Sequence, residues 1–196
     1  APYHTPVHQD MQRLARQLAD HFAPRTGASH DIWLRDPATG DKQLVDGGEE
    51  KSEEEPIYGR TYLPRKFKMG IALPHDNCID VYTQDLGLLA IVEQDRLVGY
   101  NMLVGGGLGV TPSNKKTYPA LAKRLAFVEP GEVLAVAEAV VKVQRDHGAR
   151  EDRKTARLKY LVDRWGIDAF CARVEEYCGH ALQPLRPVDV HEMADH

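Results

Sequence analysis

Two apolar runs joined by a short polar turn fix the centre of this fold. Residues 86–92 and 97–104 are rich in Leu, Val and Ile, and Gln94-Asp95-Arg96 separates them. Such runs are typical of strands, and so short a connection predicts an antiparallel hairpin. A third apolar run at residues 69–73 precedes the pair, so a sheet should occupy the middle of the chain.

Segments on either side of the predicted sheet repeat apolar residues at helical spacing. Residues 5–22, 131–147 and 166–178 each place apolar side chains along one helix face. Asp152 is a suitable N-cap for another helix that runs to about residue 165. We therefore expect an α+β domain, in which a mixed sheet of about five strands has helices packed on one side.

A polar stretch separates a short strand candidate at residues 32–34 from the predicted sheet. Residues from about 36 to 56 contain Gly47-Gly48-Glu49-Glu50 and Glu53-Glu54-Glu55. This composition predicts a mobile, solvated acidic loop more readily than a functional acidic site. Apart from this loop, we expect residues 1–196 to form a single domain.

Composition favours a globular protein and argues against several function classes. The 196 residues are 42% hydrophobic, and the formal net charge of -4 gives no global support for nucleic-acid binding. No apolar run is long enough to span a membrane, and no signal-peptide pattern is present. The three cysteines and nine histidines follow no metal-ligand pattern, so we expect a cytoplasmic protein with reduced thiols and no metal site of its own.

Three cations lie directly before the apolar run at residues 69–73. On an extended strand, Lys66 and Lys68 would share one face, and Arg65 would point away from both. Neighbouring ammonium groups repel each other, so the lysine pair could bind an oxyanion and deliver protons to it. Lysine is also common on solvated sheet edges, and residue chemistry alone leaves both interpretations open.

A glycine-rich run at residues 105–109 follows the predicted hairpin. Its backbone amides could approach a phosphate or carboxylate closely, although a tight turn without a ligand explains the glycines equally well. The Gly-Lys-Ser/Thr ending of a nucleotide P-loop is absent. Asn114 and Lys115 lie a few residues further on, and their polar side chains favour the interpretation of this run as part of an anion-binding site.

A basic segment begins the helix predicted after Asp152. Arg153 and Arg157 are four residues apart and would share a helix face. Such a face can bind polycarboxylates, phosphates or nucleic acid, although solvated surface charge is the more usual role.

Several motifs point to one family when they are taken in chain order. They are Thr61-Tyr62-Leu63-Pro64-Arg65-Lys66-Phe67-Lys68, Pro74-His75-Asp76-Asn77-Cys78-Ile79-Asp80-Val81, Gln84-Asp85-Leu86-Gly87, the run from Val98 to Gly109, Asn114-Lys115-Lys116-Thr117-Tyr118, and the run from Asp152 to Tyr160. In these motifs the chain resembles the haemoprotein (beta) component of assimilatory sulfite reductase, within the sirohaem-dependent sulfite and nitrite reductase family. The resemblance covers nearly the whole chain.

The resemblance implies a specific chemistry. Members of this family reduce sulfite to sulfide, or nitrite to ammonia, at a sirohaem that shares a cysteine with a [4Fe–4S] cluster. By resemblance, Lys66 and Lys68 are the catalytic residues that hold the anionic substrate and assist proton delivery. The resemblance also implies that Arg157 pairs with a sirohaem carboxylate. The complete set of expected cofactor-binding residues is Arg65, Gly106, Gly107, Asn114, Lys115, Arg153 and Arg157.

The chain departs from the family pattern in its cysteines. The family holds its cluster with two closely spaced cysteine pairs, and Cys78, Cys171 and Cys178 do not match them. We therefore expect the central domain of a larger enzyme, inactive alone and binding sirohaem weakly at best. Its expected partners are sulfite, the remaining domains, and an NADPH flavoprotein or ferredoxin as electron donor.

Two alternatives stay open on the sequence. A sirohaem nitrite reductase would share the chemistry and differ in its substrate. A non-catalytic anion- or nucleic-acid-binding module would use the same basic clusters, and its affinity would fall steeply with salt.

Overall fold

The computed structural model describes residues 5–26, 32–46 and 54–188. Within these residues, the main sheet has four strands in the order β3-β4-β5-β6. Their bounds are Met69–Ala72 for β3, Leu86–Glu93 for β4, Arg96–Val104 for β5 and Lys123–Val128 for β6. β3 runs parallel to β4, and the other two pairs are antiparallel. The sheet is mixed, as expected, but the described residues give it four strands and not about five.

The predicted hairpin is confirmed as β4 and β5. Gln94 and Asp95 form its turn with φ angles of 50° and 60°. Positive φ at both central residues is the geometry that suits the right-handed twist of two adjoining strands. β6 was not predicted from the sequence.

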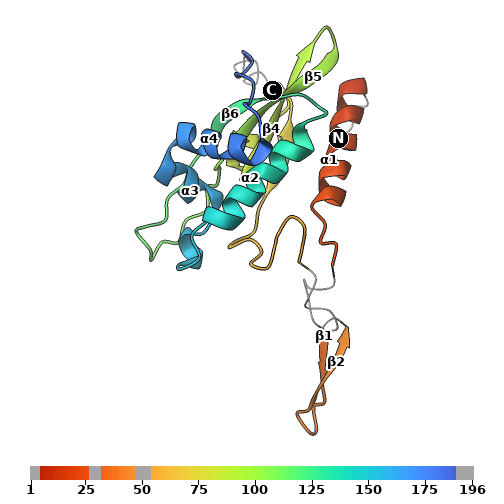
Figure 1. Ribbon diagram of the computed structural model, residues 1–196, viewed down its shortest axis with the longest axis vertical. Helices are drawn as coiled ribbons and strands as arrows, with labels where there is room; N and C mark the ends of the chain where they lie inside the picture. The colour runs from red at the N-terminus through yellow and green to blue at the C-terminus, as the bar shows by residue number, and fades with distance from the viewer. Residues whose placement is uncertain (1–4, 27–31, 47–53, 189–196) are drawn as a thin grey trace.

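In the described part of the chain, four α-helices cover one face of the main sheet, as expected (Figure 1). They are α1 (Pro6–His21), α2 (Val133–His147), α3 (Leu158–Trp165) and α4 (Ile167–Cys178). The main core forms where their apolar faces meet alternate residues of β4 and β5, such as Leu88 and Met102. Within the described residues, no helix has the length and apolar character needed to cross a membrane.

The helix predicted from Asp152 to about residue 165 is two separate elements. Asp152 caps a short 3-10 helix, η3 (Arg153–Thr155), by accepting a hydrogen bond from the Lys154 amide. The chain is extended at Arg157, with φ of -74° and ψ of 157°, and α3 begins only after it. Arg153 and Arg157 therefore do not share a helix face, and that expectation was wrong.

The other face of the sheet carries a smaller core and the end of the described chain. Leu89 and Leu103 pack there with Val81 of the 3-10 helix η2 (Val81–Thr83). The Asn101 side chain exchanges two hydrogen bonds with the backbone of Arg186. The last described residues are thereby held against this face.

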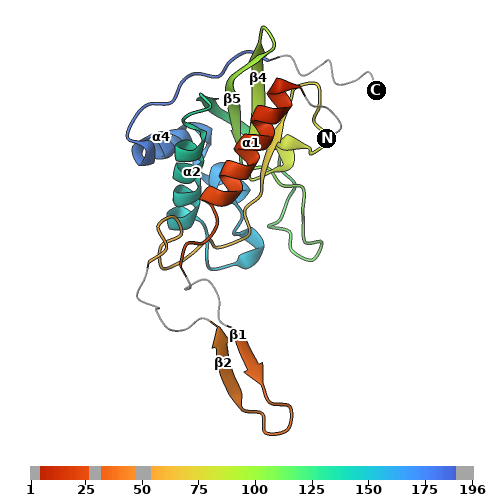
Figure 2. The same ribbon diagram turned by 90° about the vertical axis from the view of Figure 1, so that its right-hand side faces the viewer.

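A second, two-stranded sheet lies apart from the main sheet in both views (Figures 1 and 2). It consists of β1 (Ile32–Arg35), which confirms the strand candidate at residues 32–34, and β2 (Lys42–Asp46). The prediction of a loop from about 36 to 56 is wrong over β2. The prediction of a solvated loop is also wrong at Glu55, which is only 3% exposed. Residues 47–53 of the predicted loop lie outside the described part of the chain.

Candidate functional site

A pocket of about 730 Å³ forms between the segment before β3, the loop after β5, and η3 with the start of α3. Seven of its described lining residues are cationic: Arg65, Lys66, Lys68, Arg153, Lys154, Arg157 and Lys159. Asp152 is the one acid among the described lining residues, and its carboxylate is engaged as the cap of η3. We call this the cationic pocket.

Five of the nine predicted site residues line this pocket. Lys66 and Lys68 are exposed and lie immediately before β3. The Lys68 carbonyl accepts a hydrogen bond from the Leu86 amide at 3.0 Å, which prolongs the pairing of β3 with β4. Arg65 was expected to point away from the lysines, but it lines the same pocket because the chain bends at Pro64 and Arg65.

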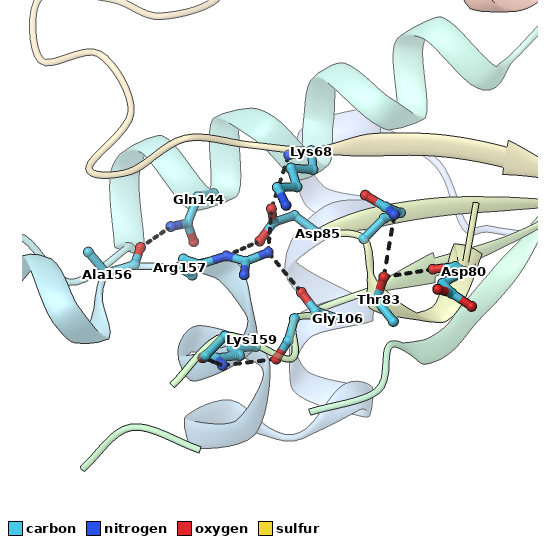
Figure 3. A network of polar contacts seen from close by, with 12 residues as sticks. Lys68, Asp80, Thr83, Asp85, Gly106, Gln144, Ala156, Arg157 and Lys159 are labelled. Carbon is cyan, nitrogen blue, oxygen red and sulfur yellow. Dashed lines mark hydrogen bonds and ion pairs between the residues drawn. The ribbon is translucent and has the colours of Figure 1, made fainter. Parts of the chain in front are cut away.

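Asp85 lies beneath the pocket and was not predicted as a site residue. Its side chain is fully buried and contacts two of the pocket's cationic residues (Figure 3). Oδ1 accepts from Arg157 Nε at 3.2 Å, and Oδ2 accepts from Arg157 Nη2 at 2.9 Å and from the Lys68 amide at 3.0 Å. Burial raises the pKa of Asp85, while Arg157 and Lys68 act in the opposite direction.

Lys159 is a second site residue that sequence reasoning missed. It is 2% exposed, and its Nζ donates to the carbonyls of Gly107 at 2.9 Å, Gly109 at 3.0 Å and Tyr118. Burial lowers the pKa of Lys159, the positive charge of Arg157 lowers it further, and Asp85 opposes both. A sequence signal was available, since Lys159 stands among Leu158, Leu161 and Val162, the apolar residues of the predicted helix.

The sequence suggested that backbone amides of the glycine-rich loop could bind an anion. The first three amides of the loop do not do so. The amides of Gly105, Gly106 and Gly107 donate to the carbonyls of Asp85, Gln84 and Ala120. The loop supplies carbonyls to cations instead, because Gly106 accepts from Arg157 Nη2 at 3.1 Å.

Gly106 and Gly107 are buried behind the pocket and do not line it. A Cβ at Gly107 would lie 2.5 Å from Arg157 Nη1, and one at Gly106 would lie 2.3 Å from the Tyr82 carbonyl oxygen. Gly107 therefore permits close packing against Arg157, and Gly106 permits close packing against the backbone of η2.

Asn114 and Lys115 do not line the cationic pocket. The Asn114 side chain accepts from the Lys116 amide at 2.9 Å, and the Asn114 carbonyl accepts from Thr117. Lys115 is exposed on the same turn. In this arrangement the two residues shape a loop beside the pocket and contribute no charge to its lining.

A second pocket, of about 620 Å³, lies between α1 and β3. Its lining is largely apolar and includes Met11, Phe22, Phe67 and Ile71. This lining does not suit an anion, so the cationic pocket is the candidate site.

The cysteines do not form a metal site within the described residues. Those residues contain no group of three or more His, Cys, Asp or Glu side chains placed to hold a metal ion. Cys78, Cys171 and Cys178 are free thiols. Burial raises the pKa of Cys171, and burial together with nearby acids raises that of Cys178 to about 11, so neither favours the thiolate that a metal requires.

Comparison with known proteins gives a consistent family. Residues 14–182 match the model described as "Nitrite and sulphite reductase 4Fe-4S domain". The sulfite reductase [NADPH] hemoprotein beta-component of Geobacillus kaustophilus is 46% identical over 194 residues, which are 99% of this chain and 33% of the relative. The sulfite reductase [NADPH] subunit beta of Schizosaccharomyces pombe is 44% identical over 185 residues, 94% of this chain and 12% of the relative.

The fold of a solved relative agrees with this match. The Mycobacterium tuberculosis NirA protein superposes with a TM-score of 0.56 at 33% sequence identity, over 70% of this chain and 23% of NirA. The chain spans about a third of the length of the bacterial relative from Geobacillus kaustophilus. By its sequence and its fold, this chain belongs to the nitrite and sulphite reductase family.

Proposed function

We propose that this chain is the sirohaem- and substrate-binding domain of an assimilatory sulfite reductase, which reduces sulfite to sulfide at a sirohaem coupled to a [4Fe–4S] cluster. The cationic pocket carries this proposal, because it gathers Lys66, Lys68 and five further cations from separate parts of the chain. The names of the relatives from Geobacillus kaustophilus and Schizosaccharomyces pombe support the same activity.

The donor set of the pocket fits a macrocycle that carries many carboxylates. Arg153 and Lys154 are exposed at the pocket and Arg65 is half-buried, so all three can reach a ligand. Guanidinium groups suit carboxylates because their paired N–H donors match the two oxygens. Arg157 already gives Nε and Nη2 to Asp85, so Nη1 is the nitrogen through which it would meet a carboxylate.

In this proposal, Lys66 and Lys68 act on the substrate. When bound, sirohaem supplies the iron through which electrons reach the sulfur. The two ammonium groups bind the oxyanion, and they offset the negative charge that grows on its oxygens as electrons arrive. They also donate protons to those oxygens, which leave as water. The Lys68 backbone is fixed by Asp85, so part of this arrangement exists before the substrate binds.

The remaining parts of the enzyme must come from outside the described residues. The described residues hold no cluster ligand set, so cysteines elsewhere in the enzyme would hold the [4Fe–4S] cluster. An NADPH flavoprotein or a ferredoxin would donate electrons, and the "[NADPH]" in the relatives' names favours the flavoprotein. The chain alone should therefore be inactive and should bind sirohaem weakly at best.

The assignment is tested by changing both lysines in the holoenzyme that carries this chain. We expect Lys66→Met with Lys68→Met to lower methyl-viologen-driven sulfite reduction by at least about a hundredfold, since preorganised cations of this kind stabilise developing charge. The sirohaem Soret absorbance should stay near normal. The matched control, Lys42→Met with Lys123→Met, removes the same charge at two exposed lysines outside the pocket and should leave turnover unchanged.

Equal turnover in the two double variants would contradict the assignment.

Nitrite is the second candidate substrate, because the family model covers nitrite as well as sulphite reductases. Measuring kcat/KM for both anions in the same enzyme decides between them. Salt-sensitive binding of nucleic acid without haem dependence would instead favour the non-catalytic module.

A further inference from the structure

We propose that Asp85 is a positioning residue that aligns the two cationic walls of the pocket, by holding the Lys68 backbone and the Arg157 side chain on one buried carboxylate. The proposal rests on the proposed function for the identity of the pocket's ligand. The contacts that carry it belong to the chain itself.

The first contact fixes the wall that contains the lysine pair. The Lys68 amide donates to Asp85 Oδ2 at 3.0 Å, and the Lys68 carbonyl accepts from Leu86, the next residue after Asp85, at 3.0 Å. Both polar groups of the Lys68 backbone are thus tied to the start of β4. The direction in which the Lys66–Lys68 segment faces is set by that strand.

The second contact fixes the opposite wall. Arg157 lies 14% exposed at the pocket and donates two nitrogens to the Asp85 carboxylate, at 3.2 and 2.9 Å. Its Nη2 also donates to the Gly106 carbonyl at 3.1 Å. Figure 3 shows Asp85 between Lys68 and Arg157, which come from opposite sides of the carboxylate. The acid therefore joins segments that are far apart in the sequence.

Two roles for this acid give opposite expectations. Asp85 is a fully buried negative charge beside several cations. If it acted only as a counter-charge, its neutralisation would raise the positive potential of the pocket and tighten the binding of an anion. If it positions Lys68 and Arg157, the same change would misalign the two walls and weaken binding.

The experiment uses Asp85→Asn in the 196-residue chain, with uroporphyrin as the octacarboxylate probe and quenching of its fluorescence as the signal. The asparagine keeps the shape of the side chain, but it cannot offer two charged oxygens to Arg157. We expect binding about tenfold weaker than in the unchanged chain, the loss typical of a charge-assisted hydrogen bond. The charge-matched control is Asp95→Asn in the exposed β4–β5 turn, which should bind as the unchanged chain does. Binding by Asp85→Asn that equals or exceeds that of the unchanged chain overturns the proposal.

A second readout needs no ligand and separates this proposal from the proposed function. Hydrogen exchange at the Lys68 amide, followed by NMR, should be about tenfold faster in Asp85→Asn, while exchange in β5 stays unchanged. If the unchanged chain does not bind uroporphyrin, which the weak cofactor binding expected of the chain alone allows, the Lys68 exchange rate by itself decides the role of Asp85. An unchanged rate contradicts the proposal.

A third variant covers the case in which Asp85→Asn does not fold, because Arg157 would then be left without its carboxylate. Arg157→Gln alone is compared with Arg157→Gln combined with Asp85→Asn, which removes both charges. Faster Lys68 exchange in the double variant than in the single one supports positioning by Asp85. Equal exchange in the two contradicts it.

Discussion

Single residues in this chain show how burial decides what a charge does. Lys66 and Lys159 both line the cationic pocket, but Lys66 is exposed whereas Lys159 is 2% exposed and donates to three carbonyls. An ammonium group has three donors, so those of Lys159 are fully used within the protein. Lys66 remains available to a ligand, and Lys159 serves the loop that forms the pocket wall.

We therefore expect Lys159→Met to loosen the loop of residues 107–118. The methionine fills a similar volume but donates no hydrogen bond, so buried carbonyls lose their partner at a cost of roughly 1–3 kcal/mol in the free energy of unfolding. Urea denaturation measures this cost. Lys116→Met, at an exposed lysine of the same loop, is the control and should change stability by less than about 0.5 kcal/mol. Equal stability of the two variants would show that the Lys159 contacts contribute nothing.

Glu55 makes stability depend on pH. Its carboxylate accepts hydrogen bonds from the amides of Arg25 and Thr26 and from the Thr26 hydroxyl. Burial raises the pKa of Glu55, but these hydrogen bonds outweigh burial and hold the pKa below its usual value of 4.5. A depressed pKa means that the stabilisation is present above pH 4.5 and is lost as the pH falls through the folded-state value.

Glu55→Gln should accordingly be less stable than the unchanged chain at pH 7, by roughly 1–3 kcal/mol. Denaturation at a series of pH values should show this difference shrinking below the usual pKa, since the glutamate of the unchanged chain is then protonated as well. A difference that stays constant from pH 7 down to acid pH would argue against the lowered pKa.

At the scale of elements, local signals were predictable and pairings between distant segments were not. The β4–β5 hairpin followed from apolar runs and a turn within twenty residues of sequence. β6 was missed because it joins the sheet by pairing with β5 after a long loop. The sequence predicted one helix where the structure has η3 and α3. The break between them lies at Arg157, whose side chain contacts Asp85, 72 positions away in the sequence.

The pairing of β5 with β6 depends on a close approach at Gly99. A Cβ there would lie 2.4 and 2.6 Å from atoms of the Phe127 ring and 2.6 Å from the Val128 carbonyl oxygen. Gly99→Ala should therefore cost about 1–3 kcal/mol, as overpacking of a well-packed core does. Gly109→Ala is the control, because nothing lies within 4 Å of the added Cβ. Thermal unfolding compares the two, and an equally stable Gly99→Ala would show that β6 can shift freely.

On the scale of the whole molecule, a chain of net charge -4 concentrates cations at one place. Composition therefore did not predict the pocket, whereas the resemblance of short motifs to the family did indicate an anion-binding site. Arg65, Lys66, Lys68, Arg153 and Arg157, which the motifs singled out, all line this one pocket. They could not show the buried acid beneath these residues, since the burial of Asp85 arises only when β4, the β3 segment and α3 come together.

The most direct test of the cationic pocket as the sirohaem face is a crystal structure of the holoenzyme that carries this chain. We predict sirohaem carboxylates within hydrogen-bond distance of Arg65 and Arg153, with the ammonium groups of Lys66 and Lys68 facing the substrate side of the iron. A sirohaem bound elsewhere, with these four side chains open to solvent, would contradict the account.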